Sequence, residues 1–350
     1  MNLLLIGGLP PPVGGTTVLF KQLVDGLRGR DNICLRVIDV SRPTVARTNN
    51  VVHALRCLAL LFWYLRWASV LSFQTSRRGA ITFGPLVHIL SRFFRRKWIF
   101  RGFGGDIDTW HRNTSGILRW VFDHTVLQAD VLLIERKASV KYFQGQSKSS
   151  IQWYPNSRHY SEASPTIPAT SDRSRRFVFV GHVKPAKGIG ELIQAAKLLA
   201  PTGITVDVYG PLQDGISHSW FADSATNYCG PITKEAVIQT LAGYDVLVLP
   251  TYFEGEGYPG VILEAYCAGI PVIATRWGGI PEIVTAETGL LVEPRDVQGL
   301  AEAMQMLIDS DHLLATLRHG ARSKAAEFDA DRWTQYFIDL CQQLSTESRS

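Results

Sequence analysis

The chain has 350 residues, which is long for one hydrophobic core and fits two domains of ordinary size. With 46% hydrophobic and 19% charged residues, the composition is that of a globular protein and excludes a disordered chain. The net charge of +5 is unevenly distributed: residues 1–150 carry 21 Lys and Arg against 8 Asp and Glu, whereas residues 151–350 carry 15 against 23. The basic half indicates an anionic partner, either a nucleic acid or an anionic lipid surface. An arginine-rich solvated face is the alternative.

The five cysteines are scattered and form no C-x-x-C pair, which argues for a reducing compartment and against a disulfide framework or a zinc site. The opening MNLLLIGG has no basic leader and predicts a buried strand, not a secretory signal. The most apolar segment, residues 53–73, contains Arg56 and Arg66. Since a charge near mid-span costs about 2.5–3.5 kcal/mol, we do not expect this segment to cross a bilayer.

Each half of the chain alternates strand-like and helix-like patterns, which is typical of parallel α/β layers. The expected strands, in chain order, are 2–8, 34–40, 79–84, 97–103, 130–135, 176–182, 205–211, 244–250, 271–276 and 288–294. The main expected helices are 16–27, 190–200, 234–244, 260–269 and 329–344.

A stretch rich in Pro, Ser and Thr, without apolar periodicity, divides the chain. We therefore expect four segments: a Rossmann-like domain at 1–155, a linker at 156–175, a second Rossmann-like domain at 176–330 and a C-terminal helix at 331–350. In that last helix Trp333, Phe337, Leu340 and Leu344 share one face. The helix is expected to pack back on the first domain.

Two turns are candidate anion sites. Gly14 and Gly15 stand where the first helix begins, and the unpaired N–H groups of a helix start attract anions. The turn is neither a Walker loop nor a dinucleotide fingerprint, and a plain tight turn is the alternative. Lys187 lies between a strand and the next helix, where an ammonium and a helix N-terminus together suit a diphosphate. A solvated loop lysine is the alternative there.

The stretch EGEGYPGVILEAYCAG, from Glu254, places carboxylates around a third helix start. We expect the helix to begin at Pro259 or Gly260, with Glu256 in the loop and Glu264 just over one turn inside. A carboxylate in the helix can accept both hydroxyls of a ribose, and one in the loop can hold a hexose hydroxyl. The alternative is that these glutamates are surface carboxylates that interact favourably with the helix dipole, but this does not explain the glycines around them.

Together with GGLPPPVGGTTVL, FVGHVKPAKGIGELIQAA, GGIPEIV and TGLLVEP, the E-x7-E spacing of Glu256 and Glu264 resembles the family 4 retaining glycosyltransferases. The resemblance runs from the first strand to about Glu327 and is greatest to bacterial enzymes of capsule, O-antigen and exopolysaccharide assembly. It implies the GT-B fold, in which two Rossmann-like domains face across a cleft and the second holds most of the nucleotide sugar.

The resemblance also implies roles for individual residues. Glu264 would bind the ribose, Glu256 the donor hexose and Lys187 the diphosphate. The implied donor-binding residues are Gly14, Gly15, His182, Lys187, Gly230, Ile232, Glu256, Gly257, Tyr258, Pro259, Gly260, Val261 and Glu264. Among them Gly14 and Gly15 would reach the phosphates from the first domain, and the backbone of Gly230 to Ile232 would hold the base. The implied catalytic residues are Arg101, Asp106, Lys187 and Glu256.

Two residues depart from the family pattern. His182 stands where the family usually has arginine, so the phosphate clamp has one permanent cation fewer. Arg101 stands where the family commonly has histidine, and with Asp106 it could place a cation and a carboxylate on the acceptor side.

The resemblance implies neither a metal nor a cofactor, because Lys187 and helix N-termini offset the charge of the leaving diphosphate. Retention is expected by front-face attack, so neither glutamate need be a glycosidase-type nucleophile. Asp106 and Asp108 do spell the D-x-D triad of metal-dependent glycosyltransferases. Such three-residue matches arise by chance, and we expect no metal there.

The predicted protein is a cytoplasmic enzyme, peripheral on the inner face of the plasma membrane, that moves a hexose from a nucleotide sugar to a lipid-linked saccharide. We expect UDP rather than GDP, docking of the basic half on anionic lipid, and no nucleic-acid partner, since no such motif is present. Two alternatives stay open. One is a nucleotide-sugar 2-epimerase, and the other is a non-catalytic scaffold subunit of a polysaccharide assembly complex, which His182 and Arg101 would favour.

Overall fold

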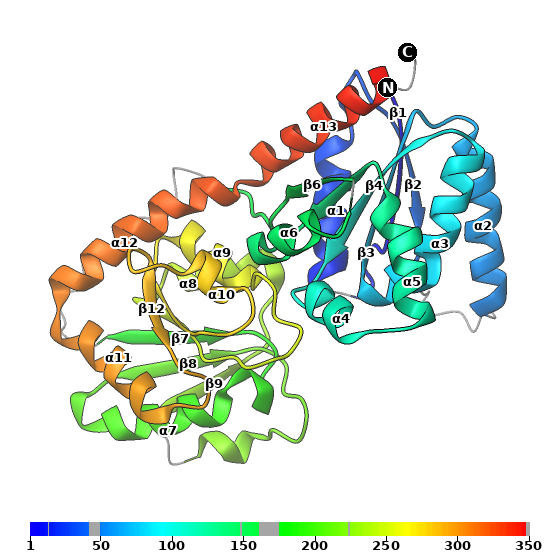
Figure 1. Ribbon diagram of the computed structural model, residues 1–350. Coiled ribbons are helices and arrows are strands. Elements are labelled where there is room, and N and C mark those ends of the chain that lie inside the picture. The colour runs from blue at the N-terminus through cyan, green and yellow to red at the C-terminus, as the bar shows by residue number, and fades with distance from the viewer. Residues whose placement is uncertain (13, 42–49, 148, 161–174, 223–224, 348–350) are drawn as a thin grey trace. The chain divides into compact units, whose positions relative to one another are not determined.

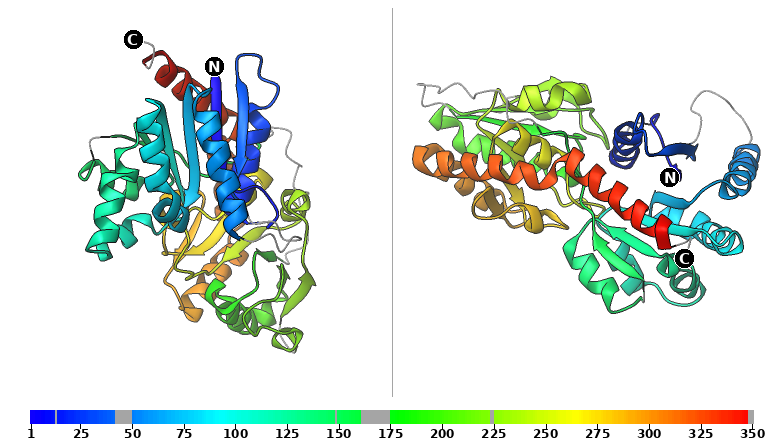
Figure 2. Two further views of the ribbon diagram at one scale, coloured as in Figure 1. Left: turned by 90° about the vertical axis from the view of Figure 1, so that its right-hand side faces the viewer. Right: turned by 90° about the horizontal axis from the view of Figure 1, so that it is seen from above.

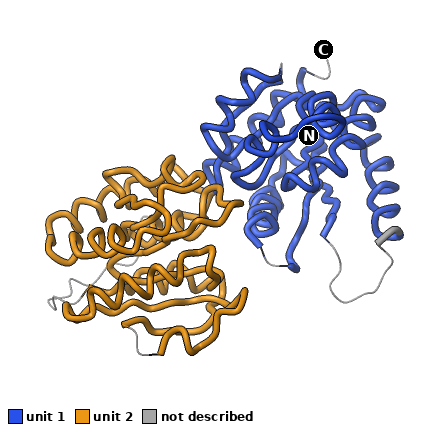
Figure 3. Tube along the Cα trace, turned by 60° about the horizontal axis from the view of Figure 1, so that its bottom comes forward, with its two compact units in different colours: residues 1–156, 330–350 blue, residues 157–329 orange. Residues whose placement is uncertain are grey.

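The computed structural model describes residues 1–12, 14–41, 50–147, 149–160, 175–222 and 225–347 (Figure 1). The chain forms two compact units (Figure 3): unit 1 is Met1–Asn156 with Ala330–Ser350, and unit 2 is Ser157–Asp329. Each unit contains a six-stranded parallel sheet with helices on it. This confirms the predicted α/β fold of two Rossmann-like domains. Most of the predicted linker lies outside the described residues.

The sheet of unit 1 has the strand order β2-β1-β3-β4-β5-β6. Its strands are β1 Asn2–Gly7, β2 Cys34–Asp39, β3 Val70–Ser76, β4 Lys97–Phe103, β5 Val131–Ile134 and β6 Ser150–Trp153. Its helices are α1 Gly15–Leu27, α2 Asn50–Leu65, α3 Arg77–Phe93, α4 Ile107–Asn113, α5 Ile117–His124, α6 Lys137–Gln144 and α13 Ala330–Glu347, with a 3-10 turn at Val126–Gln128.

The sheet of unit 2 has the order β12-β11-β10-β7-β8-β9. Its strands are β7 Arg176–Val180, β8 Thr205–Tyr209, β9 Thr226–Gly230, β10 Val246–Leu249, β11 Val272–Thr275 and β12 Gly289–Val292. Its helices are α7 Ile189–Leu199, α8 Val237–Leu241, α9 Gly260–Ala268, α10 Ile280–Ile283, α11 Val297–Asp309 and α12 Asp311–Ala325. Its 3-10 turns are Pro185–Lys187, Ala200–Thr202, His218–Phe221, Lys234–Ala236 and Ala326–Phe328.

One predicted strand of unit 1 is wrong. Residues 79–84 lie in α3, and the strand that precedes this helix is β3. β3 pairs with β1 and β4 in the middle of the sheet, so residues 70–74 are buried without alternation although Ser72 and Gln74 are polar. Residues 70–73 of this strand form one end of the apolar segment 53–73. The other end of that segment is α2. Among the described residues, no helix combines the length and the apolar character that a membrane span requires.

The strands β6 and β9 are also absent from the sequence-based prediction. Each has four or five residues and lies at the edge of its sheet, where it pairs with one neighbour and keeps exposed polar residues. Short half-exposed strands of this kind give little apolar signal.

The C-terminal helix α13 packs on unit 1, as predicted (Figure 1). Its buried face shares one hydrophobic cluster with α1 and with one face of the sheet. The hydroxyl of Tyr154 donates to the main-chain oxygen of Trp333 at 3.0 Å, and a Cβ at Gly26 of α1 would lie 3.1 Å from Thr334. The two helices therefore approach closely, and α13 completes the core of unit 1. A second cluster, under α2, α3 and α5, fills the opposite face.

Candidate functional site

The strand order of unit 2 reverses between β7 and β10. The chain runs from β7 outward through β8 to β9, then returns to β10 on the other side and continues to β11 and β12. In open parallel sheets, ligands bind at the carboxyl ends of the strands where the order reverses. The loops after β7 and β10 meet at this point, and they contain Lys187 and Glu256.

Gly188 brings these two loops together. Its φ is +77°, and a Cβ there would lie 2.1 Å from the carbonyl oxygen of Pro250, at the end of β10, so only glycine fits. The close approach lets Lys187 Nζ pair with Glu256 Oε2 at 2.5 Å. Thr251 Oγ1 donates to the same carboxylate oxygen at 2.8 Å. The ammonium and the carboxylate thus form one buried polar cluster at the edge of the sheet.

The glycine pair after β11 supports the loop that holds Glu256. Gly278 has a φ of +54°, and a Cβ there would lie 2.3 Å from the main-chain oxygen of Glu256. A Cβ at Gly279 would lie 2.7 Å from the main-chain oxygen of Gly257. The backbone of residues 256–257 is therefore fixed by close packing, and the Glu256 side chain starts from a defined position.

Helix α9 begins directly after this loop, with Pro259 as its N-cap residue. Tyr258 is buried, and its hydroxyl donates to Glu282 Oε2 at 2.7 Å. Gly260 and Val261 form the first, half-buried turn. A helix start presents main-chain N–H groups and the positive end of the helix dipole, which suit phosphate oxygens. The helix start therefore adjoins the Lys187–Glu256 pair through the chain itself.

Glu264 lies one turn further into α9 and is 8% exposed. Its Oε1 accepts a hydrogen bond from Nε of Arg158 at 2.6 Å. No sequence pattern indicates Arg158, because this residue is in the predicted linker and lies 106 positions away from Glu264 in the chain. Each of the two predicted ligand carboxylates is thus paired with a cation of unit 2.

The other predicted residues of unit 2 lie at the same edge of the sheet. His182 is exposed and lies two residues after the end of β7. Gly230 ends β9 with a φ of +83°, and its carbonyl accepts from Gly210 N at 2.9 Å. Ile232 is half-buried two residues later. The order of the strands puts Gly230 two strands away from β7.

The structure places Gly14 and Gly15 in unit 1, at the start of α1. Gly14 is the N-cap residue, and its N–H donates to Thr17 Oγ1 at 3.0 Å. The first helical hydrogen bond runs from Val18 N to Gly14 O at 3.0 Å. Gly15 is exposed in the first turn. This turn is a true helix N-terminus, as the sequence predicts.

Arg101 lies inside unit 1, where it is 3% exposed. Its guanidinium carbon is 4.6 Å from the ring centre of Phe103 and 4.3 Å from that of Tyr154, and Nη1 donates to Gln74 Oε1 at 3.3 Å. Burial lowers the pKa of Arg101 and raises the pKa of Tyr154 to about 12. Asp106 is nearer the surface and pairs with Arg77 at 2.6 Å.

The two carboxylates of the D-x-D triad have different environments. Asp106 is the N-cap residue of α4 and faces Arg77, whereas Asp108 is buried and accepts from Ser139 Oγ at 2.8 Å. Within the described residues, no three His, Cys, Asp or Glu side chains are grouped as metal ligands would be.

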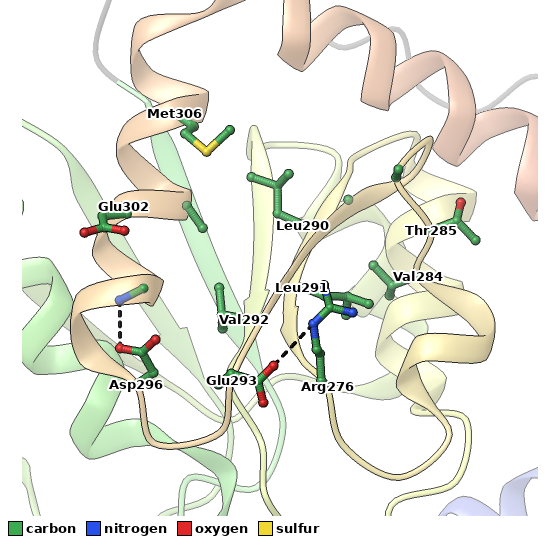
Figure 4. A pocket seen from close by; sticks show the side chains of 14 residues that line it. Arg276, Val284, Thr285, Leu290, Leu291, Val292, Glu293, Asp296, Glu302 and Met306 are labelled. Carbon is green, nitrogen blue, oxygen red and sulfur yellow. Dashed lines mark hydrogen bonds and ion pairs between the residues drawn. The ribbon is translucent and has the colours of Figure 1, made fainter.

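A cavity of about 650 Å³ lies elsewhere in unit 2, along the edge strand β12 and helix α11 (Figure 4). Leu290, Leu291 and Met306 contribute apolar side chains to its lining, and two further lining residues, Arg276 and Glu293, pair at 3.4 Å. None of its described lining residues belongs to the predicted donor set. The chemistry of the Lys187 and Glu256 loops, and not the size of this cavity, identifies the candidate site.

A family profile described as Glycosyl transferases group 1 matches residues 174–310. CapM of Staphylococcus aureus, a capsular polysaccharide biosynthesis glycosyltransferase, is 33% identical over 153 residues, which cover 42% of this chain and 40% of CapM. Glycogen synthase of Mycobacterium tuberculosis is 30% identical over 164 residues, or 43% of this chain and 38% of that protein. The chain thus aligns with about two fifths of the length of these curated relatives.

Solved structures resemble the chain over nearly its whole length. The crystal structure of Anabaena Alr3699/HepE in complex with UDP superposes with a TM-score of 0.73 and 18% identity, and the match covers 98% of this chain and 100% of that one. The complex of the same protein with UDP-glucose gives a TM-score of 0.72 over 97% of this chain and 99% of that one. At this level of identity the likeness shows the fold, which is the two-domain α/β fold of the GT-B type.

Proposed function

We propose that the chain is a retaining, metal-independent glycosyltransferase, a proposal that the match of residues 174–310 to the Glycosyl transferases group 1 profile supports. It would move a hexose from a nucleotide sugar, UDP rather than GDP, to a lipid-linked saccharide in bacterial surface polysaccharide synthesis. The observation that carries the proposal is the polar cluster of Lys187, Glu256 and Thr251 beside the start of α9. The capsular role in the name of CapM and the UDP bound to Alr3699/HepE support the product class and the donor class.

In this proposal the donor lies on unit 2. Its diphosphate would contact the first-turn N–H groups of α9 and the Lys187 ammonium, its ribose would donate to Glu264, and Glu256 would accept from the hexose. Since Lys187 already pairs with Glu256, a bound diphosphate would share the ammonium with that carboxylate. As the leaving diphosphate gains charge, the fixed N–H groups and the ammonium would stabilise it without a metal. Asp106 pairs with Arg77 and Asp108 accepts from Ser139, and these protein partners support the proposal that the D-x-D triad holds no metal.

The proposal is tested with the full chain and a panel of UDP- and GDP-sugars. We expect UDP-sugars to raise the melting temperature most, and the best of them to be consumed when membranes with lipid-linked saccharide are added. EDTA should leave this turnover intact. Loss of turnover that only Mn²⁺ or Mg²⁺ restores would contradict a metal-free mechanism. Release of ManNAc from UDP-GlcNAc without acceptor would favour the epimerase, and binding of no nucleotide sugar would favour the scaffold subunit.

We further propose that the acceptor is reached at the inner face of the plasma membrane, through unit 1. Helices α2, α3 and α5 form a layer over one face of its sheet, which faces the viewer in the left panel of Figure 2. Large apolar side chains are exposed on these helices: Trp63 (64%), Phe93 (73%), Ile117 (75%) and Trp120 (59%). The guanidinium of Arg66 lies 4.6 Å from the ring centre of Phe62. Exposed aromatic and apolar groups among arginines suit an anionic lipid surface.

Vesicle flotation tests the membrane proposal. We expect the protein to float with vesicles that contain phosphatidylglycerol and to bind them less at high salt. With vesicles of pure phosphatidylcholine it should remain unbound at the bottom of the gradient. Phe93→Glu and Ile117→Glu should reduce flotation several-fold, because each adds a negative charge to the contact surface. Met306→Glu, at an exposed apolar position of unit 2 (52%), is the control and should float like the wild type. Binding that ignores salt and lipid charge would contradict the proposal.

A further inference from the structure

Arg158 is buried although it comes from a stretch with the composition of a linker. The residue is 9% exposed, and its main-chain N–H donates to the carbonyl of Phe328 at 2.9 Å. Its Nη1 donates to the carbonyl of Ser157 at 2.9 Å, and its Nε donates to Glu264 Oε1 at 2.6 Å. Main-chain and side-chain contacts therefore hold the guanidinium in one place against α9.

Gly260, the first residue of α9, makes room for this guanidinium. A Cβ at Gly260 would lie 1.8 Å from Nη2 and 2.9 Å from the guanidinium carbon of Arg158. The cation thus lies against the first turn of the helix, where the dipole favours anions and disfavours cations. The Glu264 carboxylate, one turn further on, offsets this cost.

Stability alone does not account for the arrangement. Burying an ion pair costs desolvation of both charges, and well-packed apolar residues of similar volume are often as stable. A planar guanidinium differs from an apolar residue in that it fixes the direction of a carboxylate. The carboxylate that Arg158 pairs with is that of Glu264, which the proposed function assigns to the ribose. A carboxylate has about four acceptor positions on its two oxygens, so one bond from Arg158 leaves acceptor capacity for two hydroxyls.

We propose that Arg158 is a positioning residue for the donor nucleotide: it holds the Glu264 carboxylate, charged and correctly directed, for the ribose hydroxyls. The inference rests on the proposed function, because it needs a nucleotide at α9. It explains the glycine at position 260, since a side chain there would collide with the guanidinium. It also places a determinant of ribose recognition in the segment by which the chain enters unit 2.

Isothermal titration calorimetry with UDP and with 2′-deoxy-UDP distinguishes a positioning role of Arg158 from a purely structural one. The wild type should prefer UDP by about tenfold or more, the usual scale for a hydrogen bond to a charged group. In Arg158→Met this preference should fall about tenfold, toward one, while Arg158→Lys should keep part of it. Arg175→Met is the matched control, because Arg175 is an equally buried arginine of unit 2 that pairs with Asp311. The control should keep the wild-type preference even where its melting temperature falls.

Glu264→Gln separates failure of this inference from failure of the proposed function. If the wild type shows no preference for UDP over 2′-deoxy-UDP, the assigned ribose site itself is wrong. If Glu264→Gln loses the preference and folded Arg158→Met keeps it, the donor site stands and the role of Arg158 is refuted. Should Arg158→Met fail to fold, Arg158→Gln takes its place, since it keeps a donor and removes the charge. It too is expected to lose the preference, and a wild-type ratio in that variant would overturn the inference.

Discussion

Replacing Lys187 or Glu264 with alanine is expected to lower the rate of hexose transfer by about 10²-fold or more in each case, the scale of a lost electrostatic contact near the transition state. Lys187→Ala removes the cation that pairs with Glu256 and would meet the diphosphate. Glu264→Ala removes the proposed ribose ligand and leaves Arg158 as a buried cation without its carboxylate, which is costly in itself. Release of UDP from the donor sugar, followed by chromatography, measures both rates.

Matched controls lie on the same loops. Lys184 is three residues before Lys187, and its ammonium lies 4.0 Å from the ring centre of Phe253. Glu254 is exposed on the loop after β10. Lys184→Ala and Glu254→Ala should turn over donor within a few-fold of the wild type, because neither residue belongs to the polar cluster. Wild-type turnover in both Lys187→Ala and Glu264→Ala would refute the site.

Phe337→Ala is expected to lower the free energy of unfolding of unit 1 by about 3–5 kcal/mol, the usual cost of truncating a buried phenylalanine. The ring is fully buried in the cluster that α13 shares with α1 and the sheet, so its loss would leave a cavity in the core. Urea denaturation followed by tryptophan fluorescence measures the change, since Trp333 lies in the same cluster.

Gln335→Ala is the control on the same helix. Gln335 is exposed and donates to Asp339 on the next turn at 2.8 Å, so its replacement should change the free energy of unfolding by no more than about 0.5 kcal/mol. A cost below about 1 kcal/mol for Phe337→Ala would contradict a core role for α13.

The strands of unit 2 could largely be predicted from the sequence, and those of unit 1 less well. Five of the six strands of unit 2 lie within the predicted ranges, and three of them, β7, β8 and β10, are short runs followed directly by Gly or Pro, the pattern of a buried parallel strand. In unit 1, β3 continues an apolar stretch that starts in α2, so no change of composition marks the border. Residues 79–84 contain Ile81 and Thr82 between glycines, and such residues favour a strand locally. The segment is nevertheless helical, because it belongs to α3, which packs on β3 and β4.

The candidate site could be predicted where it is local in sequence. Nine positions include Glu256, the start of α9 and Glu264, and Lys187 stands just before a predicted helix. Their spacing alone therefore indicates that these side chains lie near helix N-termini. The contact of Arg158 with Glu264 spans 106 positions and depends on the path of the chain into unit 2. Likewise, the sequence of a strand does not show that its arginine will lie against two aromatic rings, as Arg101 of β4 does.

Hydrogen exchange with a saturating nucleoside diphosphate tests the central claim most directly, because it reports where on unit 2 the ligand binds. We expect UDP to slow exchange in peptides that cover 182–190 and 251–264, and to leave 284–306, along β12 and α11, unchanged. Protection confined to 284–306 would place the ligand in the cavity of Figure 4 and contradict the assignment of Lys187, Glu256 and Glu264 as the donor site.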